Sequence, residues 1–231
     1  MPKITWIGQS AVLVEGERTK FIIDPYITDN PDIKNGLKPE DISVDYILVT
    51  HGHWDHLGDT IKIAKNTKAT VIAPFELITY LQGKGIENVH PMHIGGAHRF
   101  SDDFWVKLTI AHHGSAVMNE EEGIVYTGNP CGFVVEIDNK KIYHSGDTGL
   151  FLDMQLIGEN RLDLAMIPIG DNFTMGPEDG ARAVEFLKPK MVMPMHYLAW
   201  DLIRQDPDEF VKLVGDKAEV KILKPGDSLE I

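Results

Sequence analysis

The chain has only one cysteine, Cys131, among its 231 residues. An intramolecular disulfide needs two cysteines, so no disulfide framework can stabilise this fold. Cys131 begins the apolar run 131–135, and we expect it to be a small buried hydrophobe rather than a nucleophile or a metal ligand. The fold must therefore be stabilised by an ordinary hydrophobic core.

Long apolar runs are also absent. No segment approaches the roughly 18 consecutive apolar residues that a membrane-spanning helix needs. Residues 1–6 enter a strand pattern at once, without a basic segment followed by a long apolar one, so no secretory signal is evident. We expect a cytoplasmic protein without a membrane partner. A homo-oligomer is neither required nor excluded.

Basic side chains are in deficit: 22 Lys and Arg stand against 35 Asp and Glu, which gives a formal net charge of −13. Proteins bind nucleic acids largely by neutralising phosphates with Lys and Arg, and no basic cluster compensates here. We therefore expect a small-molecule substrate and no nucleic-acid partner. A small anionic substrate is compatible with the acidic chain, because two divalent ions would make a site locally positive.

Length and hydrophobic content, 231 residues and 43%, are typical of a single globular α/β domain spanning 1–231. Apolar runs bounded by turn residues predict early strands over Ile4–Ile7, Ala11–Val14, Phe21–Ile23 and Tyr46–Val49, with a long loop over Thr28–Asp45. Periodicity and capping residues predict helices from Asp59, as the cap, to about Asn66, then over Phe75–Gln82, Pro177–Leu187 and Pro207–Val214. Short apolar runs do not reveal the order of strands in a sheet.

The most informative stretch, residues 51–56, reads His-Gly-His-Trp-Asp-His and directly follows the apolar run 46–50. Imidazole and carboxylate together suit zinc, iron or manganese. The H-x-H-x-D-H spacing lets two side chains serve one ion while the next two turn toward a second. A solvated polar loop that happens to be rich in histidine is the alternative for so short a motif.

Three later apolar runs end in the same way. Residues 104–111 lead into His112 and His113, residues 141–144 end in His144 and are followed by Asp147, and residues 191–195 lead into His196. In layered α/β proteins the loops that leave the carboxyl ends of strands carry ligands and catalytic groups. The pattern predicts that four strand ends converge on one site.

With this motif, the stretches 146–151, 168–179 and 194–197 resemble the metallo-β-lactamase superfamily of binuclear metal hydrolases, and the match covers nearly the whole chain. Within the superfamily they resemble a poorly characterised group of predicted metal-dependent hydrolases, related to the ascorbate-phosphate lactonase branch. The resemblance implies an αββα sandwich, with two sheets between helical layers. It does not identify a substrate.

The resemblance also implies a ligand set. The first metal is expected on His51, His53 and His113, the second on Asp55, His56 and His196, with Asp147 as the bridge. Asp55 and Asp147 are the expected catalytic carboxylates. Two ions about 3.5–4 Å apart share a water, lower its pKa and create a hydroxide nucleophile. Zinc is favoured, and manganese, iron or nickel is compatible with the nitrogen and oxygen ligands.

His112 and His113 compete for one position, because neighbouring residues of a strand point to opposite faces. We choose His113, since the ligand histidine of the family commonly precedes Gly or Ser, and leave His112 as a pocket residue or a support for a ligand. Asp24 matches a family aspartate that orients a metal-binding histidine; a strand-end turn with Pro25 is an equal alternative.

Weaker candidates carry two readings each. The pocket could be lined by Asn172, Phe173 and Thr174, with helix capping by Thr174 as the alternative. Tyr197 either donates a hydrogen bond to developing charge or packs in the core. His144 either supports Asp147 or only ends its strand. We interpret His90, His93 and His98 as surface or core histidines and Trp54 as a packing or rim residue.

The expected function is metal-dependent hydrolysis of a small molecule by hydroxide held between two ions, with a phosphodiester or lactone favoured over a β-lactam. A metal-dependent nuclease, an iron-loaded redox protein and a non-catalytic ligand-binding regulator are the alternatives. The acidic balance argues against the nuclease, and the short chain lacks a flavin partner for redox chemistry.

Overall fold

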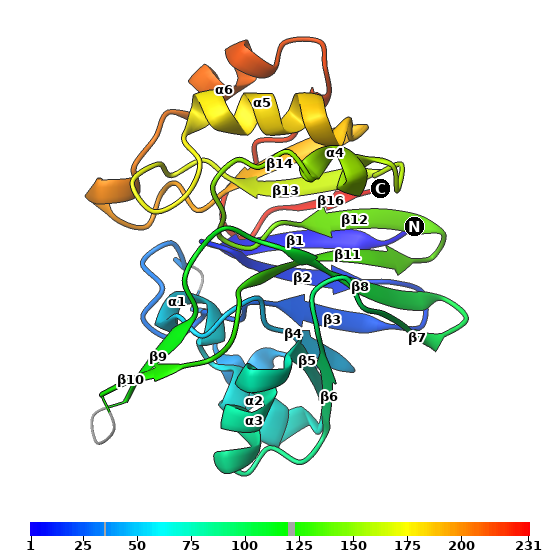
Figure 1. Ribbon diagram of the computed structural model, residues 1–231, viewed down its shortest axis with the longest axis vertical. Coiled ribbons are helices and arrows are strands. Elements are labelled where there is room, and N and C mark those ends of the chain that lie inside the picture. The colour runs from blue at the N-terminus through cyan, green and yellow to red at the C-terminus, as the bar shows by residue number, and fades with distance from the viewer. Residues whose placement is uncertain (35, 120–122) are drawn as a thin grey trace.

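Two seven-stranded sheets lie face to face between two layers of helices in the computed structural model, which describes residues 1–34, 36–119 and 123–231. Figure 1 shows α4, α5 and α6 above the sheets and α2 and α3 below them. This is the αββα sandwich of the metallo-β-lactamase type that the sequence resemblance implied.

The first sheet has the order β16-β1-β2-β3-β4-β5-β6. Its strands are β1 (Lys3–Gly8), β2 (Ala11–Glu15), β3 (Lys20–Ile23), β4 (Tyr46–Leu48), β5 (Thr70–Pro74), β6 (Val89–Met92) and β16 (Ser228–Glu230). Strands β3 to β6 are parallel to one another, whereas β16, β1, β2 and β3 pair antiparallel.

The second sheet has the order β15-β14-β13-β12-β11-β8-β7. Its strands are β7 (Ala97–Ser101), β8 (Phe104–Ile110), β11 (Cys131–Ile137), β12 (Lys140–His144), β13 (Leu164–Pro168), β14 (Met191–Met195) and β15 (Glu219–Val220). Strands β12 to β15 run parallel, and β11 is antiparallel to both of its neighbours.

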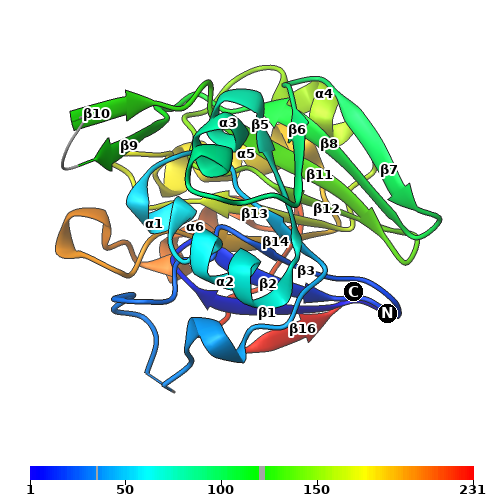
Figure 2. The same cartoon turned by 90° about the horizontal axis from the view of Figure 1, so that it is seen from below.

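The helices and a small hairpin complete the fold. The helical segments are η1 (Pro39–Asp41), α1 (Trp54–Leu57), α2 (Thr60–Thr67), α3 (Phe75–Gly83), α4 (Met154–Gly158), α5 (Pro177–Leu187), η2 (Asp201–Ile203) and α6 (Pro207–Val214). The hairpin pairs β9 (Ala116–Asn119) with β10 (Gly123–Tyr126) and projects from the same end of the molecule as α1, whereas both termini lie at the other end (Figure 2). Within the described ranges, no helix has the length and apolarity to cross a membrane.

The main core lies between the sheets and continues beneath α5. Trp6 and Phe21 of the first sheet and Phe104 and Phe133 of the second are fully buried in it. A second cluster packs α2 and α3 on the outer face of the first sheet, where residues such as Ile63 are inaccessible to solvent. Burial of apolar surface on both faces explains why a central strand such as β13 is apolar along its length.

The predicted elements agree with the structure, with local differences. Asp59 occupies the N-cap position of α2, but its carboxylate accepts hydrogen bonds from the backbone of Ile27 and Thr28 and from the Thr28 hydroxyl, and does not cap the helix. The helix predicted over Phe75–Gln82 extends one residue further in the structure, to Gly83. The short helices α1 and α4 were not predicted, because four or five residues are too few to show helical periodicity.

One edge of the sandwich collects the carboxyl ends of the strands that matter for function. Strands β8 and β12 both pair antiparallel with β11 and so run in the same direction, and β14 runs parallel to them through β13. In the first sheet, β1 and β4 also run in the same direction. Strand β4 is parallel to β3, and β1 is antiparallel to β2, which is itself antiparallel to β3. The segments that follow these strands therefore leave the sheets together.

Candidate metal centre

The H-x-H-x-D-H segment turns sharply as it leaves β4. His51 is fully buried, His53 stands at the N-cap position, and the single turn of α1 directs Asp55 and His56 inward. Gly52 allows this turn, because a Cβ there would collide with the Thr127 hydroxyl and the backbone of the neighbouring segment. A six-residue stretch can thus present four ligands only because its backbone packs closely against the strand beside it.

Seven side chains converge at this edge of the sandwich. Their ligand atoms form three groups, within each of which all atoms lie within 4.8 Å of one another: His51, His53 and His113; His51, His56 and Asp147; and Asp55, His56 and His196. We call His51, His53 and His113 the first group, and Asp55, His56 and His196 the second group. The segments after β4, β8, β12 and β14 supply them, so the four predicted strand ends do meet.

Asp147 lies between the two groups. Its Oδ2 is 3.6 Å from Nε2 of His113, 3.2 Å from Nε2 of His56 and 3.1 Å from Nε2 of His196. The residue is nearly inaccessible to solvent. One carboxylate oxygen is therefore within reach of both groups, which is the position that a bridging ligand requires.

The first group is held neutral by its surroundings. Burial lowers the pKa of His51 well below its usual value, and the neighbouring imidazole of His56 lowers it further. Burial likewise lowers the pKa values of His53 and His113. Neutral imidazole is the form that binds a metal ion, so this group is in its ligating protonation state at neutral pH.

The second group is a network of opposite charges. Burial opposes the charged forms, but Asp147 and the neighbouring carboxylates raise the pKa of His56 well above its usual value and that of His196 to about 9. In the same way His56 and His196 outweigh the burial of the Asp55 carboxyl and lower its pKa. Without an ion, protonated imidazoles thus supply the positive charge that the buried carboxylates need.

Asp24 holds His56 from behind. Its Oδ2 accepts a hydrogen bond from Nδ1 of His56 at 2.8 Å, and its two oxygens accept from the backbone N–H and hydroxyl of Thr50 at 2.8 and 2.7 Å. This is the contact expected of an orienting carboxylate, and it leaves Nε2 of His56 directed at Asp55 and Asp147. The alternative reading also holds in part, because the Asp24 carbonyl accepts from the N–H of Tyr26 in a turn.

Two buried ligand atoms in the centre make no hydrogen bond. Within the part of the chain that the structure describes, Nε2 of His56 and Oδ1 of Asp147 are buried and make no hydrogen bond. A buried polar atom without a partner is costly, and a metal ion would satisfy both atoms. The donor set of five imidazoles and two carboxylates suits divalent transition metals, so the residues fit such ions.

His113, not His112, belongs to the cluster. Both residues lie beyond the end of β8, where Nε2 of His113 approaches Nδ1 of His53 to 3.2 Å, whereas His112 is exposed and packs on Phe151 with ring centroids 4.9 Å apart. His144 supports the turn that carries Asp147: its Nε2 donates to the Ser10 carbonyl, and its Nδ1 accepts from the N–H of Gly146.

The remaining candidates divide between packing and the pocket. Tyr197 is buried, stacks on Trp6 and has its pKa raised to about 12 by burial, so it packs rather than facing a substrate. The hydroxyl of Thr174 donates to the adjacent carbonyl of Met175, and α5 begins without a side-chain cap. Cys131 is fully buried, as expected.

The histidines outside the motif lie elsewhere. His90 and His98 face each other across β6 and β7, and His93 stacks on Phe75. None of them is in a group of potential metal ligands among the described residues. Their interpretation as surface or core histidines therefore agrees with their positions.

Gln9 is the residue of this centre that the sequence interpretation missed. It is fully buried in the turn after β1, and its Nε2 donates to Oδ2 of Asp55 at 3.0 Å. Its carbonyl accepts from the N–H of His196, and Gln9, Asp24 and His196 all have positive φ, at 52°, 46° and 57°. Such backbone conformations in residues other than glycine concentrate at functional sites. The sequence did hold one signal for Gln9: like the ligands, it follows an apolar run that ends at the same edge of the sandwich.

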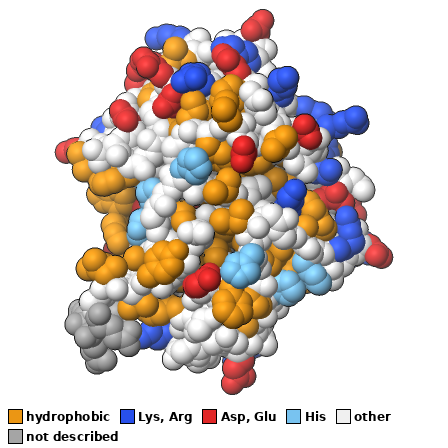
Figure 3. Space-filling view, in the orientation of Figure 1, with side chains coloured by type: hydrophobic (Ala, Val, Ile, Leu, Met, Phe, Trp, Pro, Cys, Tyr) orange, Lys and Arg blue, Asp and Glu red, His pale blue; other side chains and the backbone are white. Residues whose placement is uncertain are grey.

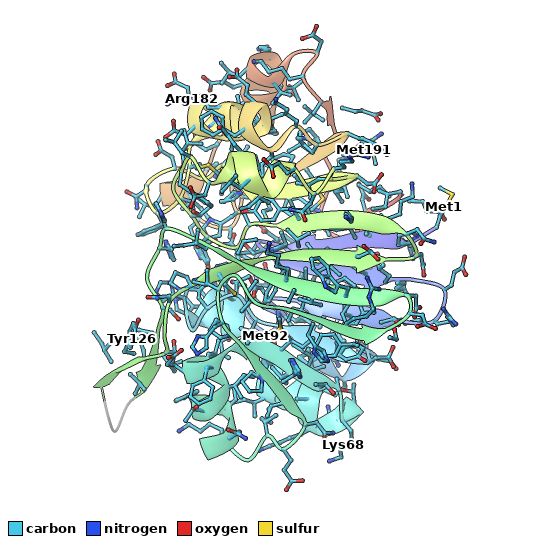
Figure 4. All side chains as sticks on the ribbon, turned by 45° about the vertical axis from the view of Figure 1, so that its right-hand side comes forward. Met1, Lys68, Met92, Tyr126, Arg182 and Met191 are labelled. Atoms are coloured by element: carbon cyan, nitrogen blue, oxygen red, sulfur yellow. The ribbon has the colours of Figure 1, made fainter. Side chains whose placement is uncertain are left out.

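A cavity of about 520 Å³ opens over the metal centre. It is lined by His53, Trp54, Asp55, His113, Met118, Asp147, Phe173, His196, Trp200, Leu202 and Ile203. Figure 3 shows hydrophobic side chains gathered along the left-hand edge of the molecule, the end from which the hairpin projects. In Figure 4 Tyr126 marks this hairpin, at the opposite end of the sheets from Met1. Of the 172–174 loop, only Phe173 lines the cavity.

Comparison with known proteins gives concordant matches. The model of the beta-lactamase superfamily domain matches residues 19–197. The chain is 53% identical over 232 residues to a "UPF0173 metal-dependent hydrolase" of Pelotomaculum thermopropionicum, with 99% of this chain and 100% of the relative covered. A protein of the same description from Geobacillus sp. is 53% identical over 231 residues, with the same coverage.

Among solved structures, the metallo hydrolase Igni18 from Ignicoccus hospitalis superposes with a TM-score of 0.89 at 35% identity. The match covers 100% of this chain and 99% of that one. The likeness therefore extends over the whole sandwich.

Proposed function

The chain belongs to the beta-lactamase superfamily, and from this premise we propose that it is a metal-dependent hydrolase that holds two divalent ions and hydrolyses a small molecule. The observation that carries the proposal is the overlap of three potential ligand groups around Asp147. Seven ligand residues are more than one tetrahedral ion can use. Zinc is the favoured ion, and manganese, iron or nickel is compatible with this donor set.

Two ions bound here would supply Lewis acidity, lowering the pKa of a shared water toward neutrality and polarising the bond under attack. The side chains set the geometry for that chemistry. Asp147 stands within reach of both groups, and Asp24 and Thr50 fix the ring of His56 and the start of the motif. Asp55 accepts a hydrogen bond from Gln9 and lines the cavity, which supports a role beside the reacting bond of a substrate bound there.

A phosphodiester or a lactone is the favoured substrate bond, ahead of a β-lactam. Both develop negative charge on a phosphoryl or carbonyl oxygen during attack, and a pair of cations stabilises such charge. A nuclease is disfavoured, because the formal net charge is −13 and the cavity lining that the structure describes includes no Lys or Arg.

Metal analysis and a substrate panel test this function together. Gently purified protein is expected to approach two transition-metal ions per chain by elemental analysis, and to hydrolyse at least one of a set of phosphodiesters, lactones and small amides. Activity should vanish on chelation and return with metal. Saturation at a single ion would contradict the two-ion proposal.

The companion variant is Asp55→Ala, compared with wild type at equal folding and full metal supply across the whole panel. Loss of hydrolysis in the variant alone supports the proposal. If neither protein hydrolyses any substrate while a small ligand binds in a metal-dependent way, the protein is a binding protein instead.

A further inference from the structure

The cavity over the metal centre divides cleanly by chemistry. Its polar lining residues are His53, Asp55, His113, Asp147 and His196, all of which belong to the metal centre. All its other lining residues are apolar or aromatic. Among the described residues, the lining contains no Lys or Arg and no side chain with an aliphatic hydroxyl or an amide.

This division limits what can bind. A charged or strongly polar substituent that enters the cavity loses water, and beyond the metal centre the side chains of the described lining offer it only the indole N–H groups of Trp54 and Trp200 as donors. The reacting group can occupy that place, but the rest of the substrate must then rest on the apolar walls. A phosphodiester brings a negative charge and two non-bridging oxygens, and no Lys or Arg among the described lining residues can pair with them.

The rim carries the strongest sign of an apolar ligand. Trp54 is 58% exposed, Met118 72%, Phe173 53% and Leu202 61%. Single exposed hydrophobic residues are normal on protein surfaces, but these four surround one opening. They come from α1, β9, the loop before α5 and η2, so four separate segments place apolar side chains at the same mouth.

We propose that this cavity accepts uncharged substrates with an apolar body, and that the bond cleaved belongs to a carboxylic ester or lactone rather than a phosphodiester. The inference rests on the proposed hydrolase function and narrows it. Trp54 and Trp200 pack edge to face at 5.2 Å and form one continuous aromatic wall for an alkyl or aryl group. The carbonyl end then faces Asp55, Asp147 and the histidines.

The reaction is a simple hydrolysis. The oxygen of water forms a bond to the carbonyl carbon, the bond from that carbon to the ester oxygen breaks, and the ester oxygen takes one proton to become an alcohol. The other proton is released when the new carboxylic acid ionises. No oxidant, reductant or second substrate is needed.

A series of γ-lactones whose alkyl side chain grows by one methylene at a time tests the proposal. Each methylene transferred from water to an apolar wall should raise kcat/KM about fourfold until the chain reaches the rim. Dialkyl phosphodiesters of matched chain lengths should be hydrolysed more slowly at every length. A flat lactone series, or faster turnover of the phosphodiesters, overturns the proposal.

Two leucines with equal exposure distinguish an effect of the cavity from a general effect of surface hydrophobicity. Leu202 and Leu156 are both 61% exposed, but only Leu202 lines the cavity, whereas Leu156 lies on α4. Leu202→Ser should lower kcat/KM for the longest lactone about tenfold relative to the shortest. Leu156→Ser should leave kcat/KM unchanged for both the longest and the shortest lactone. Phe173→Ser, at another exposed rim position, should act like Leu202→Ser; equal slopes in all proteins overturn the proposal.

A binding measurement separates this inference from the hydrolase function. 2-Alkylcyclopentanones resemble lactones but cannot be hydrolysed, and their binding should change the fluorescence of Trp54 and Trp200. If their affinity rises with chain length while no phosphodiester, lactone or amide of the panel is cleaved, the apolar ligand class stands and the hydrolase function fails. If lactones are cleaved without any dependence on length, the function stands and the apolar ligand class fails. If no substrate is cleaved and the affinity for the ketones does not depend on chain length, both the hydrolase function and the apolar ligand class are contradicted.

Discussion

The two halves of the candidate metal centre differ in how they manage charge. The first group consists of three imidazoles, and burial keeps their pKa values low. The second group combines Asp55 with His56 and His196, whose pKa values are raised by the carboxylates around them. The first group is thus ready for an ion as it stands, whereas the second must give up protons to receive one.

The two halves also differ in support. His56 of the second group is held by Asp24, and Asp55 by Gln9, both through buried hydrogen bonds. In the first group the fully buried His51 has the Thr50 hydroxyl 2.9 Å from its Nδ1, whereas His53 and His113 are partly exposed in the cavity. Changes in the second group should therefore disturb geometry and charge together, while changes in the first should act mainly on metal binding.

The largest effect is expected from Asp147→Asn, because Asp147 serves both halves. An amide is a poor bridge between two cations, and the substitution removes a buried negative charge beside His56, His113 and His196. We expect at least about a hundredfold loss of kcat/KM, accompanied by loss of metal. Elemental analysis and kinetics at saturating metal measure both.

The matched control is Asp163→Asn. Asp163 is also buried, but it directly precedes β13 and pairs with Lys190 at the amino end of that strand, away from the centre. The Asp163→Asn variant should retain metal and activity. Two tightly bound ions and full activity in Asp147→Asn would remove Asp147 from the centre.

The next effect separates two neighbouring histidines. His113→Ala removes a first-group ligand and should weaken binding of one ion about a hundredfold, whereas His112→Ala should leave affinity unchanged. His112 is exposed and contacts Phe151 rather than the cluster. Competition with a metal-binding dye measures the affinities. The reverse order would assign the ligand to His112.

The sequence located the residues of both groups, and the supporting Asp24, better than it located the cavity. A ligand motif and strand-end histidines are local signals, so His51 or His196 can be located from neighbouring residues alone. Gln9 joins the centre through its backbone conformation and a contact with Asp55, 46 positions away, which no local pattern reveals. The rim is assembled from four separate segments, so its apolar character becomes visible only in three dimensions.

A smaller effect is expected from Gln9→Leu, which removes the hydrogen bond to Asp55 but no ligand. Partners that orient metal ligands typically contribute tenfold or more to affinity, so we expect about a tenfold weaker second ion and an unchanged first. Gln205→Leu is the control, since Gln205 is part-buried and its side-chain amide donates to the Gly170 carbonyl rather than to a ligand residue. Equal weakening of both ions in Gln9→Leu would show a general loss of structure instead.

The smallest effect is a count of protons. Because the pKa of His196 is raised to about 9 and that of His56 is also raised, both rings hold protons in the metal-free protein at pH 7. A metal ion must displace them, so its binding to the second group should release roughly one to two protons at pH 7. Proton release should decline as pH rises through about 9, because His196 then loses its proton without a metal ion. The first group, with lowered pKa values, should release almost none.

Calorimetric titrations of His113→Ala, which keeps the second group, and of His196→Ala, in two buffers of different ionisation enthalpy, measure the difference. Equal proton release in the two variants would show that both halves carry the same charge before metal binds.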